Sequence, residues 1–382
     1  LLLMMAMPMM AQKVNVGKIT QDLELELRAS RSSEEMFHVI VIMEEQFDVQ
    51  KHYRQIQYLN KQQQRDFVME ELKQLSQRNQ KEVMKDLQQG QKNALVDRVK
   101  SYWIINAISC SMTKDMVYSI ADRYDVKCVM KDMEIHIVDG EENEPVVVEG
   151  NRASNQWNVT RVHANDVWNL GYTGQGVIVA VIDTGVNYNH TDIINNMWDG
   201  GVEYPNHGWD FANDDNDPMD DHSHGTHCAG TVSSYGTNGY QCGIAKDAKI
   251  MALKVLNANG SGSVSTNWSA EEFAVSHGAD VISMSLGSDG SGGIWQERVV
   301  MENVLYCGVV ASVAAGNVGN TYQNGQLKYP IPYNIGSPGN CPSPWRNPVQ
   351  TLDGGRAAVV TVGATTSDTP DQHSAFSSYG PE

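Results

Sequence analysis

The second half of the chain carries apolar runs in which apolar and polar residues do not alternate. The runs lie at 177–182, 250–256, 281–285, 309–314 and 357–362. Such runs are typical of strands in a parallel sheet that is covered on both faces. Between them, 269–277 and 295–307 have apolar residues at helical spacing, and His277-Gly278 supplies a helix stop. We therefore predict a doubly wound α/β domain, whose ligands bind beyond the carboxyl ends of its strands.

The first part of the chain shows a different pattern, in which strands and helices are mixed. Its residues predict strands at 37–43, 101–108 and 126–138, and helices at 61–91 and 114–123. The long helix has apolar positions mostly three or four residues apart, which gives it one narrow buried stripe. These elements predict a small α+β domain. The acidic segment 139–151 contains Pro and Gly, so we interpret it as a linker.

Composition agrees with two domains of unequal size. A chain of 382 residues with 41% hydrophobic content can bury one sizeable core and a smaller one. The net charge of -18 is uneven, because residues 151–382 hold only 9 basic against 22 acidic residues. An acidic surface repels phosphate backbones, so we expect no nucleic-acid partner. We also expect no membrane span, since no interior apolar run has the required length.

The chain begins with an apolar stretch, Leu1 to Ala11, that ends at a small residue. This is typical of the hydrophobic part of a secretory signal with cleavage after Ala11, and it predicts a secreted or extracytoplasmic protein. A buried terminal helix or strand is the alternative. Because no basic residues precede Leu1, we expect the beginning of the signal to be missing.

Two motifs carry the most chemistry. Asp183-Thr184-Gly185 follows the run 177–182, and His224-Gly225-Thr226-His227 lies a short way downstream. A carboxylate at the end of a buried strand would hold a neighbouring histidine in one tautomer and stabilise its imidazolium form. Asp-Thr-Gly alone is also typical of aspartic proteases. Those enzymes need two carboxylates that share a proton, and the chain contains no second Asp-Thr-Gly or Asp-Ser-Gly.

The histidine-rich segment permits other interpretations. His222, His224 and His227 have a spacing that could bind zinc, and three merely structural histidines are a further alternative. The small residues around them, Gly225, Ala229 and Gly230 among them, favour a closely packed helix that begins at His224.

Two further strand ends carry candidate binding groups. Asn317 follows the run 309–314 and could point its amide into the cleft to stabilise an oxyanion, although a turn Asn with positive φ is the alternative. Ser285-Leu286-Gly287 could offer backbone groups to an extended peptide that adds as a strand, although such a segment is more often a loop.

Taken in order, these segments closely resemble the subtilisin-like serine proteases. The resemblance runs from Trp157 to Glu382 and is carried by VIVAVIDTGVNYNHTDI, DDHSHGTHCAGTV, IMALKVLNANGSGSVS, VISMSLGS, VASVAAGNVGN and AFSSYGPE. The segment VWNLGYTGQGVIVAVIDTGVNYNH is similar to the bacillopeptidase F-like branch.

The resemblance implies a role for each candidate residue. Asp183 would be the triad acid, His224 the general base and Asn317 the oxyanion donor. The implied peptide-binding wall is Ser285, Leu286 and Gly287, and the implied lining of the first specificity pocket is Ala315 and Gly316. Cys228 would lie beside the active-site helix as a packing thiol or mercurial-sensitive site.

The family's nucleophile lies in a Gly-Thr-Ser-Met-Ala segment after an AFSSYGPE-like stretch, and the 382 residues contain no such segment. We therefore expect a truncated sequence with the serine beyond Glu382, and an inactive 382-residue chain. A non-catalytic binding or chaperone protein on the same scaffold is the alternative. A downstream Gly-Thr-Ser-Met-Ala segment would decide for the enzyme.

The resemblance further implies a zymogen. A signal remnant at 1–11 would precede an inhibitor-like propeptide at 12–138, an acidic linker with the processing site at 139–156, and the incomplete catalytic domain at 157–382. An unrelated accessory domain is the alternative to the propeptide. The implied partners are peptide or protein substrates and the propeptide as an intramolecular inhibitor. The insertion 321–355 predicts no particular role.

A loop from Trp209 to Asp221 holds six carboxylates just before His224. Oxygen ligands at alternate positions suit calcium, and the family resemblance implies Asp210, Asn213, Asp215 and Asp217 as the ligands of a structural calcium ion. A solvated acidic loop is the alternative. Asp192 matches a second calcium ligand of the family, but the segment 236–241 lacks the usual Asn-rich pattern.

Overall fold

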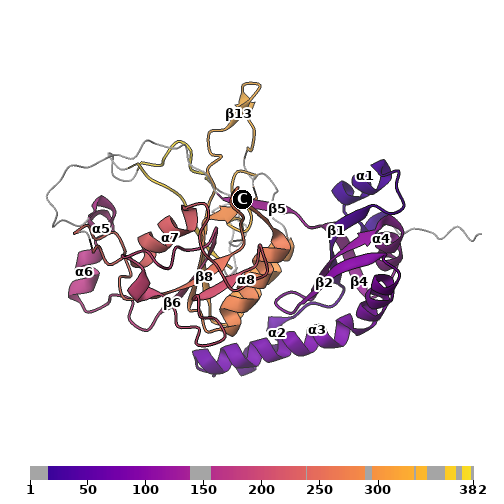
Figure 1. Ribbon diagram of the computed structural model, residues 1–382, viewed down its shortest axis with the longest axis horizontal. Helices are drawn as coiled ribbons and strands as arrows, with labels where there is room; N and C mark the ends of the chain where they lie inside the picture. The colour runs from indigo at the N-terminus through magenta and orange to yellow at the C-terminus, as the bar shows by residue number, and fades with distance from the viewer. Residues whose placement is uncertain are drawn as a thin grey trace, which may run out of the picture. The chain divides into compact units, whose positions relative to one another are not determined.

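The computed structural model describes residues 16–137, 156–237, 239–288, 295–330, 333–341, 358–366 and 372–379 (Figure 1). The predicted signal remnant at 1–11 and the linker residues 139–155 lie outside the described residues. The chain divides into two compact units. Unit 1 comprises Leu1–Gln46 and Gln74–Asp132, and unit 2 comprises Phe47–Lys73 and Met133–Glu382. The predicted limits of the propeptide and the catalytic domain stay a prediction.

Unit 1 is built around a four-stranded antiparallel sheet with the order β2-β3-β1-β4. Its elements are η1 (Val16–Lys18), α1 (Gln21–Ala29), β1 (Met36–Met43), the second part of α3 (Lys61–Lys92), β2 (Val96–Tyr102), β3 (Ala107–Thr113), α4 (Lys114–Ala121) and β4 (Val126–Lys131). The order of strands and helices is that of a split βαβ, ferredoxin-like unit. The buried stripe of α3, which includes Val83 and Leu87, packs with Val39 and Val41 of β1 in one core.

Two of the predicted strands in this region were wrong in their limits. The chain reverses between β2 and β3, within the predicted strand 101–108, and Ile104 and Ile105 in that turn are fully buried. Apolar residues are present there because the turn itself is packed inside, and not because the strand continues. The predicted strand 126–138 is divided into β4 and β5 (Glu134–Ile137), and β5 belongs to unit 2.

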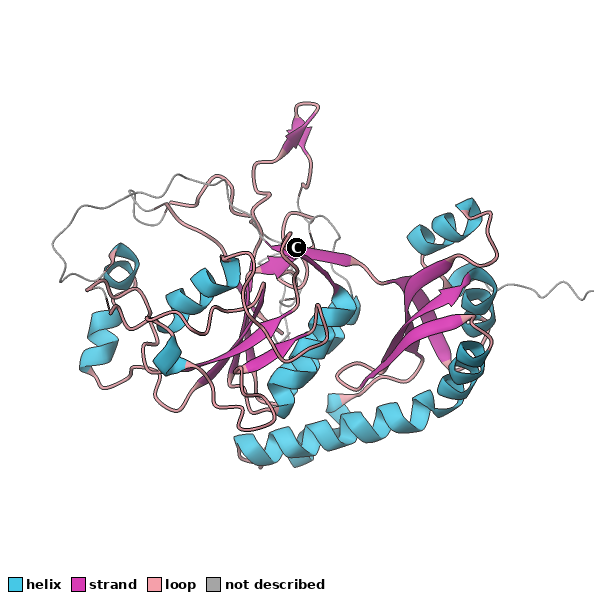
Figure 2. Cartoon of the chain, viewed as in Figure 1, coloured by secondary structure: helices cyan, strands magenta, loops and turns pink. Residues whose placement is uncertain are grey.

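Unit 2 contains the predicted parallel sheet, whose strands are among those drawn in magenta in Figure 2. The strand order is β15-β12-β10-β6-β8-β7. Its strands are β6 (Ile178–Asp183), β7 (Gly208–Asp210), β8 (Lys249–Lys254), β10 (Val281–Met284), β12 (Val310–Ala314) and β15 (Val360–Val362). Every neighbouring pair is parallel. The α/β fold class is therefore confirmed, and each predicted apolar run contains one strand.

The sheet is covered on both faces. Val179 and Val181 of β6 pack with Ala229 of α7 (His224–Ser233), whereas Ala180 and Ile182 alternate to the opposite face and are also buried. Further elements are α2 (Val49–Ile56), α5 (Trp157–Arg161), α6 (Ala164–Asn169), η2 (Ile194–Asn196), α8 (Val264–Ser276) and α9 (Trp295–Tyr306). Within the insertion 321–355, β13 (Tyr322–Gln323) and β14 (Gln326–Leu327) form a small hairpin (Figure 1).

A second, three-stranded sheet in unit 2 joins segments that are far apart in sequence. Its order is β11-β5-β9, where β9 is Ser261–Ser263 and β11 is Leu286–Gly287, and both pairings are antiparallel. Among the helices of the described residues, none is long and apolar enough to cross a membrane.

The closest backbone approach in the parallel sheet generates a test of the fold. Gly208 in β7 pairs with Ala252 in β8, and a Cβ at this position would lie 1.7 Å from the carbonyl oxygen of Ala252. We expect Gly208→Ala to lower the free energy of unfolding by about 3 kcal/mol or more, measured by denaturant titration. Gly230→Ala is the control, because a Cβ there meets no atom within 4 Å and α7 should gain stability. Equal stability of both variants would contradict the β7–β8 pairing.

Candidate active site

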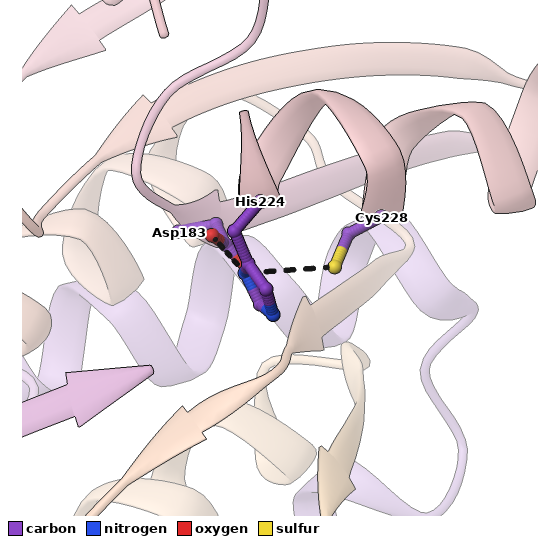
Figure 3. Close-up of side chains that lie close together, drawn as sticks. All are labelled: Asp183, His224 and Cys228. Atoms are coloured by element: carbon purple, nitrogen blue, oxygen red, sulfur yellow. Dashed lines mark hydrogen bonds and ion pairs between the residues drawn. The ribbon is translucent and has the colours of Figure 1, made fainter. Parts of the chain in front are cut away.

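Asp183 and His224 meet at the carboxyl end of the parallel sheet (Figure 3). Asp183 is the last residue of β6 and is only 1% exposed, and His224 is the first residue of α7. Their side chains are joined by a 2.7 Å hydrogen bond between Asp183 Oδ1 and His224 Nδ1. The same Oδ1 accepts the backbone N–H of Thr184 at 2.7 Å. The carboxylate is thus held by its own loop and directed at the imidazole.

This contact fixes the chemistry of the imidazole. In neutral His224 the proton sits on Nδ1, facing the carboxylate, so Nε2 is left as the acceptor. Burial by itself lowers the pKa of His224, but the hydrogen bonds with Asp183 and Cys228 and the negative charge of Asp183 outweigh it and raise the pKa to about 10. The pair therefore stabilises the imidazolium form, which a general base needs after it has taken a proton.

Cys228 lies one helical turn after His224 on α7, with its Sγ 3.9 Å from His224 Nδ1 (Figure 3). Asp183, His224 and Cys228 are the one set of three potential metal ligands in the described part of the chain whose atoms lie within 4.8 Å of one another. The three histidines considered for zinc do not gather in this way. The structure therefore disfavours the zinc interpretation.

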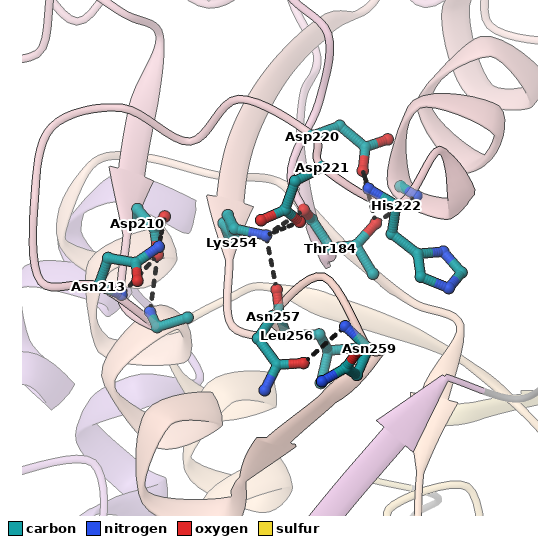
Figure 4. A network of polar contacts seen from close by, with 12 residues as sticks. Thr184, Asp210, Asn213, Asp220, Asp221, His222, Lys254, Leu256, Asn257 and Asn259 are labelled. Atoms are coloured by element: carbon teal, nitrogen blue, oxygen red, sulfur yellow. Dashed lines mark hydrogen bonds and ion pairs between the residues drawn. The ribbon is translucent and has the colours of Figure 1, made fainter.

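Asp220 connects the loop after β6 to the beginning of α7 (Figure 4). Its Oδ1 accepts the hydroxyl of Thr184 and the backbone N–H groups of His222 and Ser223, each at 2.9 Å. Its Oδ2 accepts the N–H of Thr226 at 2.9 Å and the hydroxyl of Thr226 at 2.5 Å. Burial raises the pKa of Asp220, but these donors outweigh it and lower the pKa overall.

Lys254 donates hydrogen bonds to the same loop (Figure 4). Its ammonium is 1% exposed and donates to the carbonyls of Thr184 and Leu256, both at 2.7 Å, and to Asp221 Oδ1 at 2.6 Å. Sequence reasoning assigned no role to Lys254 or Asp220. The one signal for Asp220 was its place in the acidic loop, which we interpreted as a cation site.

Within the described part of the chain, the carboxylates of Asp210, Asp215 and Asp217 do not form a set of ligand atoms within 4.8 Å of one another. Asp210 is 2% exposed, and its Oδ1 accepts the N–H groups of Ala212 and Asn213 at 2.8 and 2.9 Å. Its Oδ2 accepts the side-chain N–H of Asn213 at 2.8 Å. Asn213 therefore directs its amide nitrogen at Asp210, whereas a calcium ligand would use the amide oxygen. Asp215 accepts the N–H of Asp217 at 2.9 Å. These contacts hold the loop together, and the calcium assignment stays a prediction.

Three of the remaining predicted residues line one cavity together with His224. A cavity of about 480 Å³ is lined by residues that include His224, Ser285, Gly316 and Asn317. Leu286 and Gly287 form β11 and pair with β5. Ala315 is buried and donates its N–H to the carbonyl of Val362 at 2.9 Å. The structure therefore brings together the predicted acid, base, oxyanion donor and peptide wall.

The arrangement can be compared with known families at this point. The model of the subtilase family, a peptidase family, matches residues 174–382. The chain belongs to the subtilase family.

Individual relatives agree with this assignment. This subtilase is 32% identical to thermitase from Thermoactinomyces vulgaris, over 60% of the chain and 69% of the relative. It is 38% identical to the minor extracellular protease Vpr from Bacillus subtilis (strain 168), over 47% of the chain and 21% of the relative. Subtilisin NAT from Bacillus subtilis subsp. natto is 31% identical over 59% of the chain, which spans 50% of that relative. The chain thus spans half or less of the latter two proteins.

The Asp183–His224 pair predicts an unusual titration. The pKa of His224 is raised from 6.5 to about 10, so protonated His224 stabilises the fold fully below pH 6.5, and this contribution is lost as the pH rises towards 10. We expect an NMR titration of the His224 ring to have its midpoint above 6.5, and Asp183→Asn to lower that midpoint by at least about 1 unit, or about 1.4 kcal/mol. A midpoint that Asp183→Asn leaves unchanged would contradict the contact.

The acidic loop provides a second test. Asp210→Ala leaves three N–H donors without their acceptor, so we expect a loss of about 1–3 kcal/mol in the free energy of unfolding. The loss should be the same in a calcium chelator and in excess calcium. Asp214→Asn in the same loop removes a charge from an exposed residue and serves as the control. A loss that occurs only in calcium would instead identify Asp210 as a ligand.

Proposed function

We propose that this subtilase is the zymogen of a secreted serine endopeptidase, in which residues 12–138 form an inhibitory propeptide. The observation that carries the proposal is that β5, a strand from the end of this region, lies as a peptide would against the predicted substrate wall. The name of Vpr describes an extracellular protease, and the leader-like stretch 1–11 supports export of this chain as well.

The backbone of β5 is recognised on both sides. On one side Ile137 and His136 pair with Leu286 and Gly287 of β11. On the other side β5 pairs with β9, and the N–H of Ile137 donates to the carbonyl of Gly260 at 2.9 Å. Antiparallel addition of a strand gives affinity for any extended peptide, because the backbone supplies the hydrogen bonds. The groove is therefore suited to a polypeptide substrate.

Side-chain packing adds selectivity to this backbone pairing. Ile135 and Ile137 are 3% and 4% exposed. At Gly260, where a Cβ would lie 2.9 Å from Cγ1 of Ile137, the absence of a side chain makes room for the peptide. Because β5 occupies the groove, a substrate can enter only after β5 has left. This supports an inhibitory role for the region before the linker.

The site supports acyl transfer to a serine. His224 Nε2 would take the proton of the serine hydroxyl as its oxygen attacks the scissile carbonyl, and the carboxylate of Asp183 would stabilise the imidazolium. The amide of Asn317 would donate to the oxyanion of the tetrahedral intermediate. His224 would then protonate the leaving amine, and a water molecule would hydrolyse the acyl-enzyme by the reverse sequence of proton transfers.

We infer that the serine belongs to a segment outside the 382 residues. Among the described residues, no hydroxyl group forms a hydrogen bond with His224 Nε2. Ser377 lines the same cavity, but its Oγ is engaged by the N–H of Ala364 at 3.0 Å and by the carbonyl of Ser378 at 3.2 Å. The cavity beside His224 and Asn317 would receive the nucleophile. The linker 139–156 follows β5 directly and would contain the processing site.

Active-site labelling tests this function. We expect the 382-residue chain to show no reaction with a fluorophosphonate probe, because no hydroxyl is activated. The protein extended by its downstream reading frame should be labelled after removal of residues 1–156, and His224→Ala should reduce the labelling rate at least about 1,000-fold.

Two outcomes would contradict the proposal. Labelling of the 382-residue chain that is lost in His224→Ala would place the nucleophile within these residues. Absence of a Gly-Thr-Ser-Met-Ala segment from a complete downstream frame would favour the non-catalytic binding protein.

A further inference from the structure

The helices α8 and α9 end at the edge of the parallel sheet that is opposite to Asp183. Gly278 and Ala279 lead from α8 towards β10, and Cys307 and Gly308 lead from α9 towards β12. β6, β10 and β12 run parallel to one another. Since Asp183 is the last residue of β6, and these residues precede β10 and β12, the two sites lie at opposite edges of the sheet.

The segments that follow α8 and α9 present backbone carbonyl groups to a partner, at Ala279 and Cys307. Gly278 and Gly308 have φ values of +83° and +78°, the left-handed conformation that commonly terminates a helix. The last carbonyls of a helix have no partner within the helix and carry the negative end of its dipole. Two such ends side by side are suited to a cation that can donate several hydrogen bonds.

Arg65 on α3 supplies that cation. Its side chain is buried, at 5% exposed, and its Nη2 donates to the carbonyl of Ala279 at 2.5 Å. Its Nε donates to the carbonyl of Cys307 at 3.3 Å. One guanidinium group therefore bridges the segments that follow α8 and α9. This region of α3 belongs to unit 2, so the contact lies within one compact unit.

Two neighbours of Arg65 strengthen the contact. Gln64 donates its side-chain amide to the carbonyl of Tyr306 at 2.7 Å. Lys61 forms a 2.5 Å ion pair with Asp280 Oδ1, and Asp280 Oδ2 accepts the N–H of Ile178 at the start of β6 at 2.9 Å. Lys61, Gln64 and Arg65 are three or four residues apart, so they share one face of α3.

The glycines also permit the close approach of α3. A Cβ on Gly308 would lie 3.2 Å from Cγ of Lys61, and a Cβ on Gly278 would lie 3.4 Å from Nη1 of Arg65. The contact therefore combines backbone shape, hydrogen bonds and charge. We call the carbonyls of Ala279, Tyr306 and Cys307, together with the carboxylate of Asp280, the helix-end site.

We propose that the helix-end site is a docking surface for the first turns of α3, and that it retains the inhibitory region after the linker has been cut. The docking surface stands on the contacts above, whereas its role in retention rests on the proposed function. β5 has only four residues, and by itself it would leave the groove as a cleaved product does. The helix-end site lies at the other edge of the sheet, so cleavage at the active site does not alter it.

Release after a controlled cut tests the proposal. The linker residues 139–155 of the 382-residue chain would be given the recognition sequence of a specific exogenous protease. After cutting, the rate at which the N-terminal fragment leaves residues 156–382 would be measured by size-exclusion chromatography. We expect Arg65→Ala to accelerate release about 10- to 100-fold, because two hydrogen bonds from a charged group are lost.

Two further variants separate the geometry of the Arg65 guanidinium group from its charge. Arg65→Lys keeps the charge, but a single ammonium does not reproduce the planar fork, so release should remain at least about threefold faster than in the wild type. Arg78→Ala on the same helix removes a 3.6 Å ion pair with Glu45 between exposed side chains, and release should be unchanged. The proposal would be overturned if Arg65→Ala released the N-terminal fragment at the wild-type rate, or if Arg65→Ala and Arg78→Ala accelerated its release equally.

A milder variant covers the case in which Arg65→Ala does not fold. In uncut Gln64→Ala, hydrogen exchange should be faster in residues 61–73 and 306–310 and unchanged in β1 to β4, and unchanged exchange throughout would overturn the docking surface. Failure of the proposed function remains distinguishable. It would appear as absent fluorophosphonate labelling in the extended protein, whereas the release and exchange measurements require no catalysis.

Discussion

The burial of one carboxylate, that of Asp183, organises the active edge of this subtilase. A charged group that is 1% exposed loses its hydration and must be compensated by hydrogen bonds and an opposite charge. The N–H of Thr184 and the imidazole of His224 supply this compensation at one oxygen. Among the described residues no donor reaches the other oxygen, Oδ2. The requirement explains why the loop after β6 and the beginning of α7 must be held in register, which is the task of Asp220 and Lys254.

A related requirement applies to the backbone groups of the proposed peptide groove between β9 and β11. β9 and β11 lie on either side of β5, and without a strand between them their facing N–H and carbonyl groups would lack strand partners. β5 supplies those partners and keeps the groove ordered, but it also excludes any other peptide. Under the proposed function, the same groove would be blocked while β5 occupies it and would bind a substrate peptide once β5 has left.

The sequence predicts the parallel sheet well, because strands buried on both faces must be apolar throughout. It also predicts where Asp183, His224 and Asn317 lie in the fold, because each ends or follows such a strand or begins a helix of small residues, whereas their catalytic roles stay predictions. It does not predict the turn at Ile104 and Ile105, since apolar residues in a buried turn have the same composition as a strand. The pairing of β5 could not be predicted either, because its partners β9 and β11 are more than 120 residues away in the chain.

Asp220 and Arg65 received no role from the sequence for one common reason. Their roles depend on the ends of helices, which a linear charge pattern does not show. In a doubly wound domain the helices that follow parallel strands begin at the carboxyl edge of the sheet and end at the amino edge. The carboxyl edge therefore collects free N–H groups and partial positive charge, which Asp220 satisfies at α7.

The amino edge of the same sheet collects carbonyl groups and partial negative charge, which Arg65 satisfies after α8 and α9. An acid at one edge and a base at the other are thus two consequences of one topology. The topology also separates the two tasks in space. The proton transfer and peptide binding that we propose would occupy the edge where N–H groups can stabilise negative charge, whereas the cationic face of α3 contacts the opposite edge. In the proposed zymogen, residues 12–138 could therefore lose the contacts of β5 at one edge while α3 keeps its contacts at the other.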